Sequence, residues 1–139
     1  GWTLGQTETL QLKNKIEKIG RFIKDWKDVR IYRGIVTGLN EAFIIDENKR
    51  KEFIQEDKNC AVFIKPLLQG RNIKRFNISF DKRYLLKVIP GADIQSCKPI
   101  YNYLLHFRDR LEQRWEPENG KIKWYELRPC VYYSKFVKQ

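Results

Sequence analysis

Basic residues cluster over residues 70–83, where their type and spacing suit contact with phosphate groups. They are Arg71, Lys74, Arg75, Lys82 and Arg83. Cationic side chains at such short intervals can bind consecutive phosphates. Phe76 places an aromatic ring beside them that can pack on a sugar or a base. We therefore expect these five basic residues to contact the backbone of a nucleic acid.

A second group of polar residues, Arg33, Thr37 and Asn40, lies around Gly38 in a segment that is typical of a turn. A polar loop residue can reach a phosphate or a base edge, so we expect this group to lie near the same ligand. Asn is also favoured in turns for its own backbone conformation, and turn chemistry is the alternative explanation for Asn40.

Carboxylates give a weaker signal, for catalysis. Glu47-Asn48-Lys49 matches the Glu-x-Lys part of a metal-dependent nuclease pattern, in which Lys activates water. A second carboxylate would have to share the metal, and the candidates are Asp28, Glu41 and Asp46. Acidic residues are also favoured at the start of a helix by the helix dipole. We therefore predict no catalytic residue in this chain, and a nuclease remains an alternative.

The cysteines and the histidine offer no cluster of metal ligands. Cys60, Cys97 and Cys130 lie far apart, no Cys-x-x-Cys is present, and His106 is the only histidine. An odd number of dispersed cysteines is typical of reduced thiols in a cytosolic protein. We expect reduced thiols, no metal site and a cytoplasmic location.

Positive charge is concentrated in two segments of this 139-residue chain, whose net charge is +11 and whose pI is about 9.7. Residues 65–87 carry seven basic residues against Asp81 alone, and residues 121–139 carry five against Glu126. These segments supply ten of the eleven excess charges, as expected for a surface that tracks phosphates. The alternative is that they are solvated strand edges, where Lys discourages aggregation.

Hydrophobic spacing predicts an α+β fold in a single domain with a mixed or mostly antiparallel sheet. Two longer helices are expected over about 8–27 and 97–115, and a shorter one over 47–56. Strands are expected over 29–35, 42–45, 61–64, 83–89, 123–127 and 130–137. The apolar stripe of the first helix, from Leu12 to Trp26, is expected to pack in the core.

The longest apolar runs are far shorter than the roughly 20 residues that span a bilayer, so no membrane partner is expected. The chain contains no Met and begins at Gly1. We expect it to be a piece of a longer protein.

Several blocks of the sequence resemble a known family in their order and spacing. They are IYRGIVTGLNEAFIID at 31–46, KPLLQGRNIKRF at 65–76, YLL at 84–86, IYNYLLHFRDRLEQR at 100–114 and WYEL at 124–127. This series resembles the TaqI-like C-terminal specificity domain. That family is the target-recognition domain of certain type II restriction–modification adenine methyltransferases and of fused nuclease–methyltransferase enzymes.

The resemblance implies that residues 1–139 form a DNA target-recognition domain, a fragment of a larger protein. Such a domain positions double-stranded DNA for a methyltransferase domain of the same polypeptide. That other domain binds S-adenosylmethionine and carries an Asn/Asp-Pro-Pro-Tyr/Phe motif, which this sequence lacks. The resemblance therefore implies that this chain is not itself an enzyme and binds no cofactor. A general RNA-binding module without an enzyme partner is the first alternative, and the metal-dependent nuclease is the second.

Overall fold

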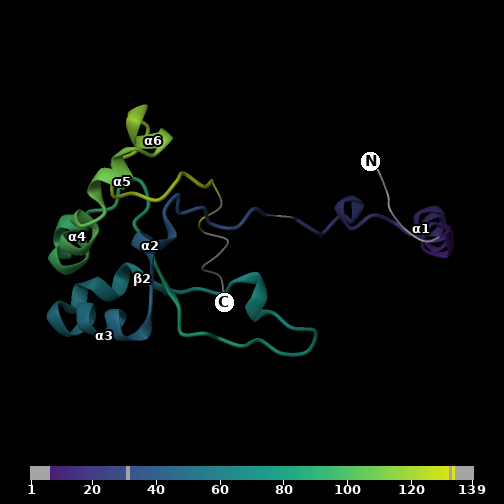
Figure 1. Ribbon diagram of the computed structural model, residues 1–139, viewed down its shortest axis with the longest axis horizontal. Helices are drawn as coiled ribbons and strands as arrows, with labels where there is room; N and C mark the ends of the chain where they lie inside the picture. The colour runs from purple at the N-terminus through teal and green to yellow at the C-terminus, as the bar shows by residue number, and fades with distance from the viewer. Residues whose placement is uncertain (1–6, 31, 132, 134–139) are drawn as a thin grey trace. The chain divides into compact units, whose positions relative to one another are not determined.

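The computed structural model describes residues 7–30, 32–131 and 133 (Figure 1). The chain divides into two compact units, Gly1–Gly34 and Ile35–Gln139. The sheet and the buried core both belong to the second unit.

The first unit contains the helix α1 (Thr7–Ile19) and the short 3-10 helix η1 (Ile23–Asp25). The helix expected over 8–27 therefore ends early, before Gly20, a residue that favours helix termination because it lacks a side chain. α1 buries none of its residues, and Ile19 is 79% exposed. The expectation that its apolar stripe packs in the core is therefore wrong for the described residues.

The second unit contains a three-stranded antiparallel sheet, in the order β1-β3-β2. The strands are β1 (Ile44–Ile45), β2 (Ile64–Pro66) and β3 (Tyr84–Leu86). Ile44 lies opposite Leu85, and Lys65 lies opposite the same residue from the other side. With the helices around it, this sheet confirms the predicted α+β class.

Two strand predictions fail in the described part of the chain. No strand forms at the described positions of 29–35 or over 123–127. Most of the strand expected over 130–137 lies outside the described residues. Short alternating runs did not form strands here because no neighbouring strand supplies the ladder of hydrogen bonds.

The helices of the second unit are short. They are α2 (Asn40–Phe43), α3 (Glu47–Glu56), η2 (Lys58–Val62), η3 (Gly70–Asn72), η4 (Ile94–Ser96), α4 (Lys98–Leu105), α5 (Arg108–Glu112) and α6 (Trp115–Glu118). α3 confirms the helix predicted over 47–56. Its start is capped by Asp46, whose side chain accepts a hydrogen bond from the N–H of Lys49 at 2.9 Å.

The helix expected over 97–115 is broken into α4, α5 and α6. α4 ends where the N–H groups of His106 and Phe107 bond to carbonyls three residues back, which tightens the last turn. The second break falls at Arg114, whose extended backbone (ψ 146°) precedes α6. Pro117 lacks an N–H and would clash with the preceding turn of a continuous helix, so it is tolerated only near the start of a new one.

The core of the second unit lies between the sheet, α2, α3 and α4. Its largest fully buried side chains are Phe43, Leu86, Ile94, Ile100, Leu104, Leu111 and Leu127. Phe53 of α3 packs edge-on against Tyr103 of α4 at 5.4 Å between ring centroids. No helix among the described residues is long and apolar enough to cross a membrane.

Candidate nucleic-acid interface

The connection between β2 and β3, residues 67–83, forms a long hairpin-like loop that we call the finger. It appears as the long teal loop in Figure 1, with η3 along its course. The pairing of β2 with β3 extends into it, because the N–H of Leu67 donates to the carbonyl of Arg83 at 2.9 Å. Backbone pairing between the two arms of the finger thus begins directly beside the sheet.

The tip of the finger is a tight hairpin. Ile73 and Ile78 pair in an antiparallel bridge, and the N–H of Lys74 donates to the carbonyl of Asn77 at 2.8 Å. These contacts leave Arg75 and Phe76 as the two central residues of the turn. The Arg75 guanidinium lies over the Phe76 ring, 5.0 Å from its centroid.

Next to the tip, Asn72 is buried (3% exposed). Its side-chain oxygen accepts a hydrogen bond from the N–H of Gln69 at 2.8 Å, and its own N–H donates to the carbonyl of Gln69. The ring of Phe80 packs edge-on against Tyr84 of β3. The finger is thus held by hydrogen bonds beside its tip and by an aromatic contact with the sheet.

The structure brings the five predicted phosphate-contacting residues together on the finger, and all five are exposed: Arg71, Lys74, Arg75, Lys82 and Arg83. Arg71 lies 3.6 Å from the carboxylate of Asp81. Within the described residues, no carboxylate lies within ion-pair distance of the other four. Unpaired cations at this density are available to an external anion, although the assignment of individual phosphate contacts stays a prediction.

The second predicted group is divided between the two units. Arg33 belongs to the first unit, whereas Thr37 and Asn40 belong to the second. Thr37 is 6% exposed, and its hydroxyl donates to the side-chain oxygen of Asn40 at 2.6 Å. Asn40 itself is exposed at the start of α2. The pair organises a turn, and its predicted role near a ligand stays a prediction.

Arg114 is an important residue that sequence reasoning missed. It is 6% exposed, and its guanidinium donates to the carbonyls of Thr37 (2.9 Å), Trp124 (2.6 Å), Glu126 (2.9 Å) and Leu111 (3.1 Å). Burial lowers the pKa of Arg114, and the charge of Glu116 acts against this shift. The side chain therefore joins the turn at Thr37, α5 and the segment 124–126.

Gly38 allows Arg114 to reach this position. Its φ is +75°, and a Cβ atom at this residue would lie 2.8 Å from Cδ of Arg114. Glycine is needed here both for the backbone conformation and for the close approach of the arginine. Gly38 was thus the sequence signal that could have pointed to this buried cation.

Glu47 and Lys49, the two residues considered for a nuclease, both form hydrogen bonds or ion pairs with other side chains. Glu47 accepts hydrogen bonds from the Tyr84 hydroxyl and, at 3.0 Å, from Arg50. Lys49 pairs with Glu52 at 2.8 Å. The Tyr84 hydrogen bond is the main cause that lowers the pKa of Glu47, with the charges of Arg50 and Lys51 acting in the same direction, and the same bond raises the pKa of Tyr84. These contacts tie α3 to β3.

Two of the carboxylates named for that alternative also have other partners within the second unit, whereas Asp28 belongs to the first unit. Asp46 caps α3, and Glu41 pairs with Arg110 at 2.5 Å. Among the described residues, the group with the geometry of a three-ligand set is Asp57, Cys60 and Cys97, whose ligand atoms lie within 4.8 Å of one another.

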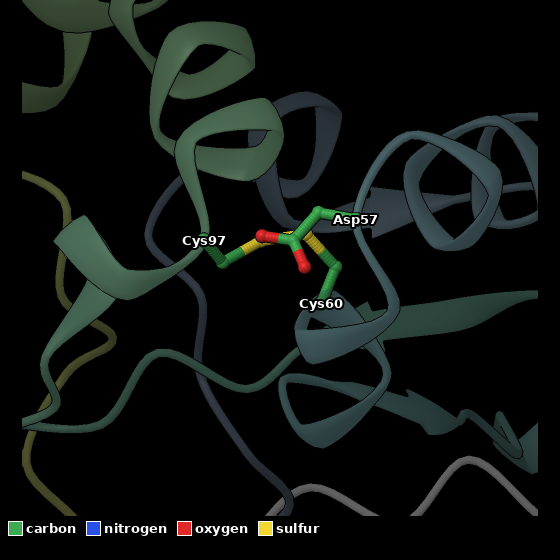
Figure 2. Close-up of side chains that lie close together, drawn as sticks. All are labelled: Asp57, Cys60 and Cys97. Atoms are coloured by element: carbon green, nitrogen blue, oxygen red, sulfur yellow. A yellow bond between two sulfur atoms is a disulfide. The ribbon is translucent and has the colours of Figure 1, made fainter.

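Cys60 and Cys97 are joined by a disulfide, with their Cα atoms 5.3 Å apart, as Figure 2 shows beside Asp57. This corrects the prediction of reduced thiols, while Cys130 is a free cysteine. The two residues are 37 positions apart in the sequence, but the turn at η2 and the start of α4 bring them within bridging distance. Spacing along the chain gave no sign of this pairing.

No protein-family profile matches the chain. Over 117 residues, the chain is 32% identical to the Type II methyltransferase M.MjaIV of Methanocaldococcus jannaschii. The aligned part covers 81% of this chain but only 38% of the relative, so the chain spans well under half the length of the curated protein it matches.

This comparison corrects one expectation and supports part of another. The relative is by name a methyltransferase, an enzyme, and it matches most of this chain, which overturns the prediction that the chain is not an enzyme. The TaqI-like specificity domain is narrower than what the match supports. The similarity supports a methyltransferase-related protein.

Proposed function

We propose that this chain is the DNA-recognition part of a type II restriction–modification adenine methyltransferase, and that the finger binds duplex DNA. The observation that carries the proposal is the gathering of five exposed basic side chains on one excursion of the sheet. The similarity to a type II methyltransferase supports DNA as the polyanion that this surface binds.

The finger suits a phosphate backbone for electrostatic reasons. Residues 65–87 have a net charge of +6, and four of the five predicted cations have no carboxylate partner within the described residues. Each phosphate that such a cation neutralises releases condensed counterions, which favours binding at low salt. The turn around Thr37 and Asn40 and the exposed Arg33 are proposed as secondary contacts with the DNA.

S-adenosylmethionine is proposed as the methyl donor of the whole enzyme. Among the described residues, the turns that lead from a strand to a helix contain at most one glycine each. Nucleotide-like cofactors are commonly held by glycine-rich turns at this position. These residues do not fit the cofactor, and we derive no step through it. The rest of the polypeptide is proposed to supply that site.

Reversal of two finger charges tests the proposal. The double variant Lys74→Glu/Arg75→Glu should bind duplexes of all sequences more weakly, because the side chains it removes contact phosphates and not bases. The slope of log Kd against log salt should decrease by about one unit for each phosphate that is no longer neutralised. Fluorescence anisotropy of labelled duplexes over a salt series measures both quantities.

The matched control is Lys51→Glu/Lys58→Glu, which changes the net charge equally at exposed positions of α3 and η2. The control should keep nearly the wild-type affinity and salt slope. Equal losses in both double variants would mean that only total charge matters. Tighter binding of structured RNA than of duplex DNA by the wild-type chain would favour an RNA-binding module and overturn the proposal.

A further inference from the structure

An aromatic side chain stands at the outermost point of the finger. Phe76 is 89% exposed, in a protein whose core buries aromatic and aliphatic residues of similar size completely. Ile73 (60%) and Ile78 (61%) below it are also exposed. Exposed apolar side chains that are grouped among charged residues suit a contact with a partner.

The position of Phe76 is fixed by the hairpin. The ring belongs to one of the two central residues of a turn that is closed by the Lys74–Asn77 hydrogen bond and the Ile73–Ile78 bridge. One face of the ring is covered by the Arg75 guanidinium. The opposite face is left for a flat, apolar partner.

The charges around the tip identify the class of that partner. Lys74 and Arg75 lie at the turn, and Lys82 and Arg83 lie on the returning strand. A hairpin arm is narrow enough to lie in a groove of B-DNA, where phosphates line both sides and the edges of the stacked bases form the floor. Proteins that bind the minor groove insert apolar side chains such as Phe between two base pairs and unstack that base step.

We propose that Phe76 inserts at a base step of the duplex and stacks on a base, while the basic residues of the finger hold the flanking phosphates. The inference rests on the proposed function, since it requires the finger to bind DNA. It adds a specific contact that charge alone does not supply. It also predicts a distortion of the DNA that a purely electrostatic surface would not produce.

The test uses the 139-residue chain and duplexes that carry 2-aminopurine, whose fluorescence rises when it is unstacked. The wild-type chain should raise this fluorescence at saturation. Phe76→Ala should abolish the rise and weaken binding about fivefold or more, the lower end of the range for a base–aromatic stack. The slope of log Kd against log salt should stay at the wild-type value, because every phosphate contact is kept. Phe76→Trp, which keeps an aromatic ring at the tip, should restore the wild-type affinity.

Trp115→Ala is the matched control, because Trp115 is another exposed aromatic residue (56%) with a cation, Lys121, over its ring at 3.9 Å. This variant should leave both affinity and fluorescence unchanged. Because Phe76 is exposed, its replacement should not change the unfolding midpoint, and a thermal melt checks this.

The possible outcomes separate the two proposals. Failure of the wild-type chain to bind any duplex would overturn the proposed function and this inference with it. Wild-type binding with no fluorescence rise, or with the same rise in Phe76→Ala, would overturn only the insertion of Phe76. Tighter binding to phosphatidylserine vesicles than to DNA, abolished in Phe76→Ala, would show that the tip touches a membrane surface instead.

Discussion

At the scale of single residues, we expect the buried cation Arg114 to contribute more to the stability of the second unit than any exposed charged residue. Its guanidinium satisfies four backbone carbonyls that come from three separate segments. Exposed ion pairs such as Arg110–Glu41 join groups that water already solvates well. A surface pair of that kind contributes at most about 1 kcal/mol to stability.

Replacement of Arg114 tests this difference. Arg114→Met keeps much of the side-chain volume but leaves the carbonyls without donors, and it should lower the free energy of unfolding by about 2–4 kcal/mol. Arg110→Met should lower it by less than about 1 kcal/mol. Urea unfolding followed by circular dichroism measures both values. Equal losses of unfolding free energy in the two variants would show that the buried hydrogen bonds of Arg114 stabilise the fold no more than an exposed ion pair does.

The residues also show what the sequence could and could not predict. The basic residues from Arg71 to Arg83 could be predicted because they are close together in the sequence. They stay close in the structure because the segment forms a single hairpin. Arg114 was missed because its role depends on carbonyls at positions 37 and 124–126, which only tertiary structure brings together. Thr37 was predicted from its loop position, and its burial follows from the same tertiary contacts.

At the scale of elements, prediction succeeded where local signals were sufficient. α3 has a capping Asp46 and a clear start, and its predicted bounds are confirmed. The helix over 97–115 was predicted too long because its apolar spacing continues through two breaks, one at His106–Phe107 and one before Pro117. β3 is shorter than the predicted 83–89, because only three of its residues pair with neighbouring strands. The predictions over 42–45 and 61–64 are only partly right, because their first residues belong to the helices α2 and η2, and β2 shares only Ile64 with the predicted 61–64.

The disulfide between Cys60 and Cys97 should be a major source of stability for these elements. For a loop of this length, the reduced entropy of the unfolded chain contributes about 3–4 kcal/mol. Cys60→Ser/Cys97→Ser should unfold at a correspondingly lower urea concentration, and reduction of the wild-type chain should produce a similar loss. Cys130→Ser should retain the wild-type midpoint and its sensitivity to reductant. Titration of three thiols per unreduced, denatured chain would show that the bond is absent.

At the scale of the whole molecule, the division into two units separates the core from the N-terminal helix. Every buried residue of the hydrophobic core lies between Ala42 and Leu127. α1 buries none of its side chains. The residues that form the core therefore all belong to the second unit. The apolar stripe of α1 has the spacing of a core helix, and spacing alone led to the wrong prediction.

Removal of residues 1–34 tests this division. The remaining chain, 35–139, keeps the sheet, the disulfide and the finger, so it should unfold cooperatively with a free energy within about 1 kcal/mol of the full chain. Its affinity for duplex DNA should decrease only by the contribution of Arg33 and the other basic residues removed. Urea unfolding and anisotropy measure these effects. Non-cooperative unfolding of the truncated chain would show that the first unit is required for the core.

The disulfide has a topological consequence for the finger. The bond between Cys60 and Cys97 closes a covalent ring that contains β2, the finger, β3 and η4. A protease that cuts an exposed bond beside Lys74 or Arg75 opens the ring without releasing a fragment. The nicked chain stays one molecule until the disulfide is reduced, so a broken fingertip would remain attached to the sheet on both sides.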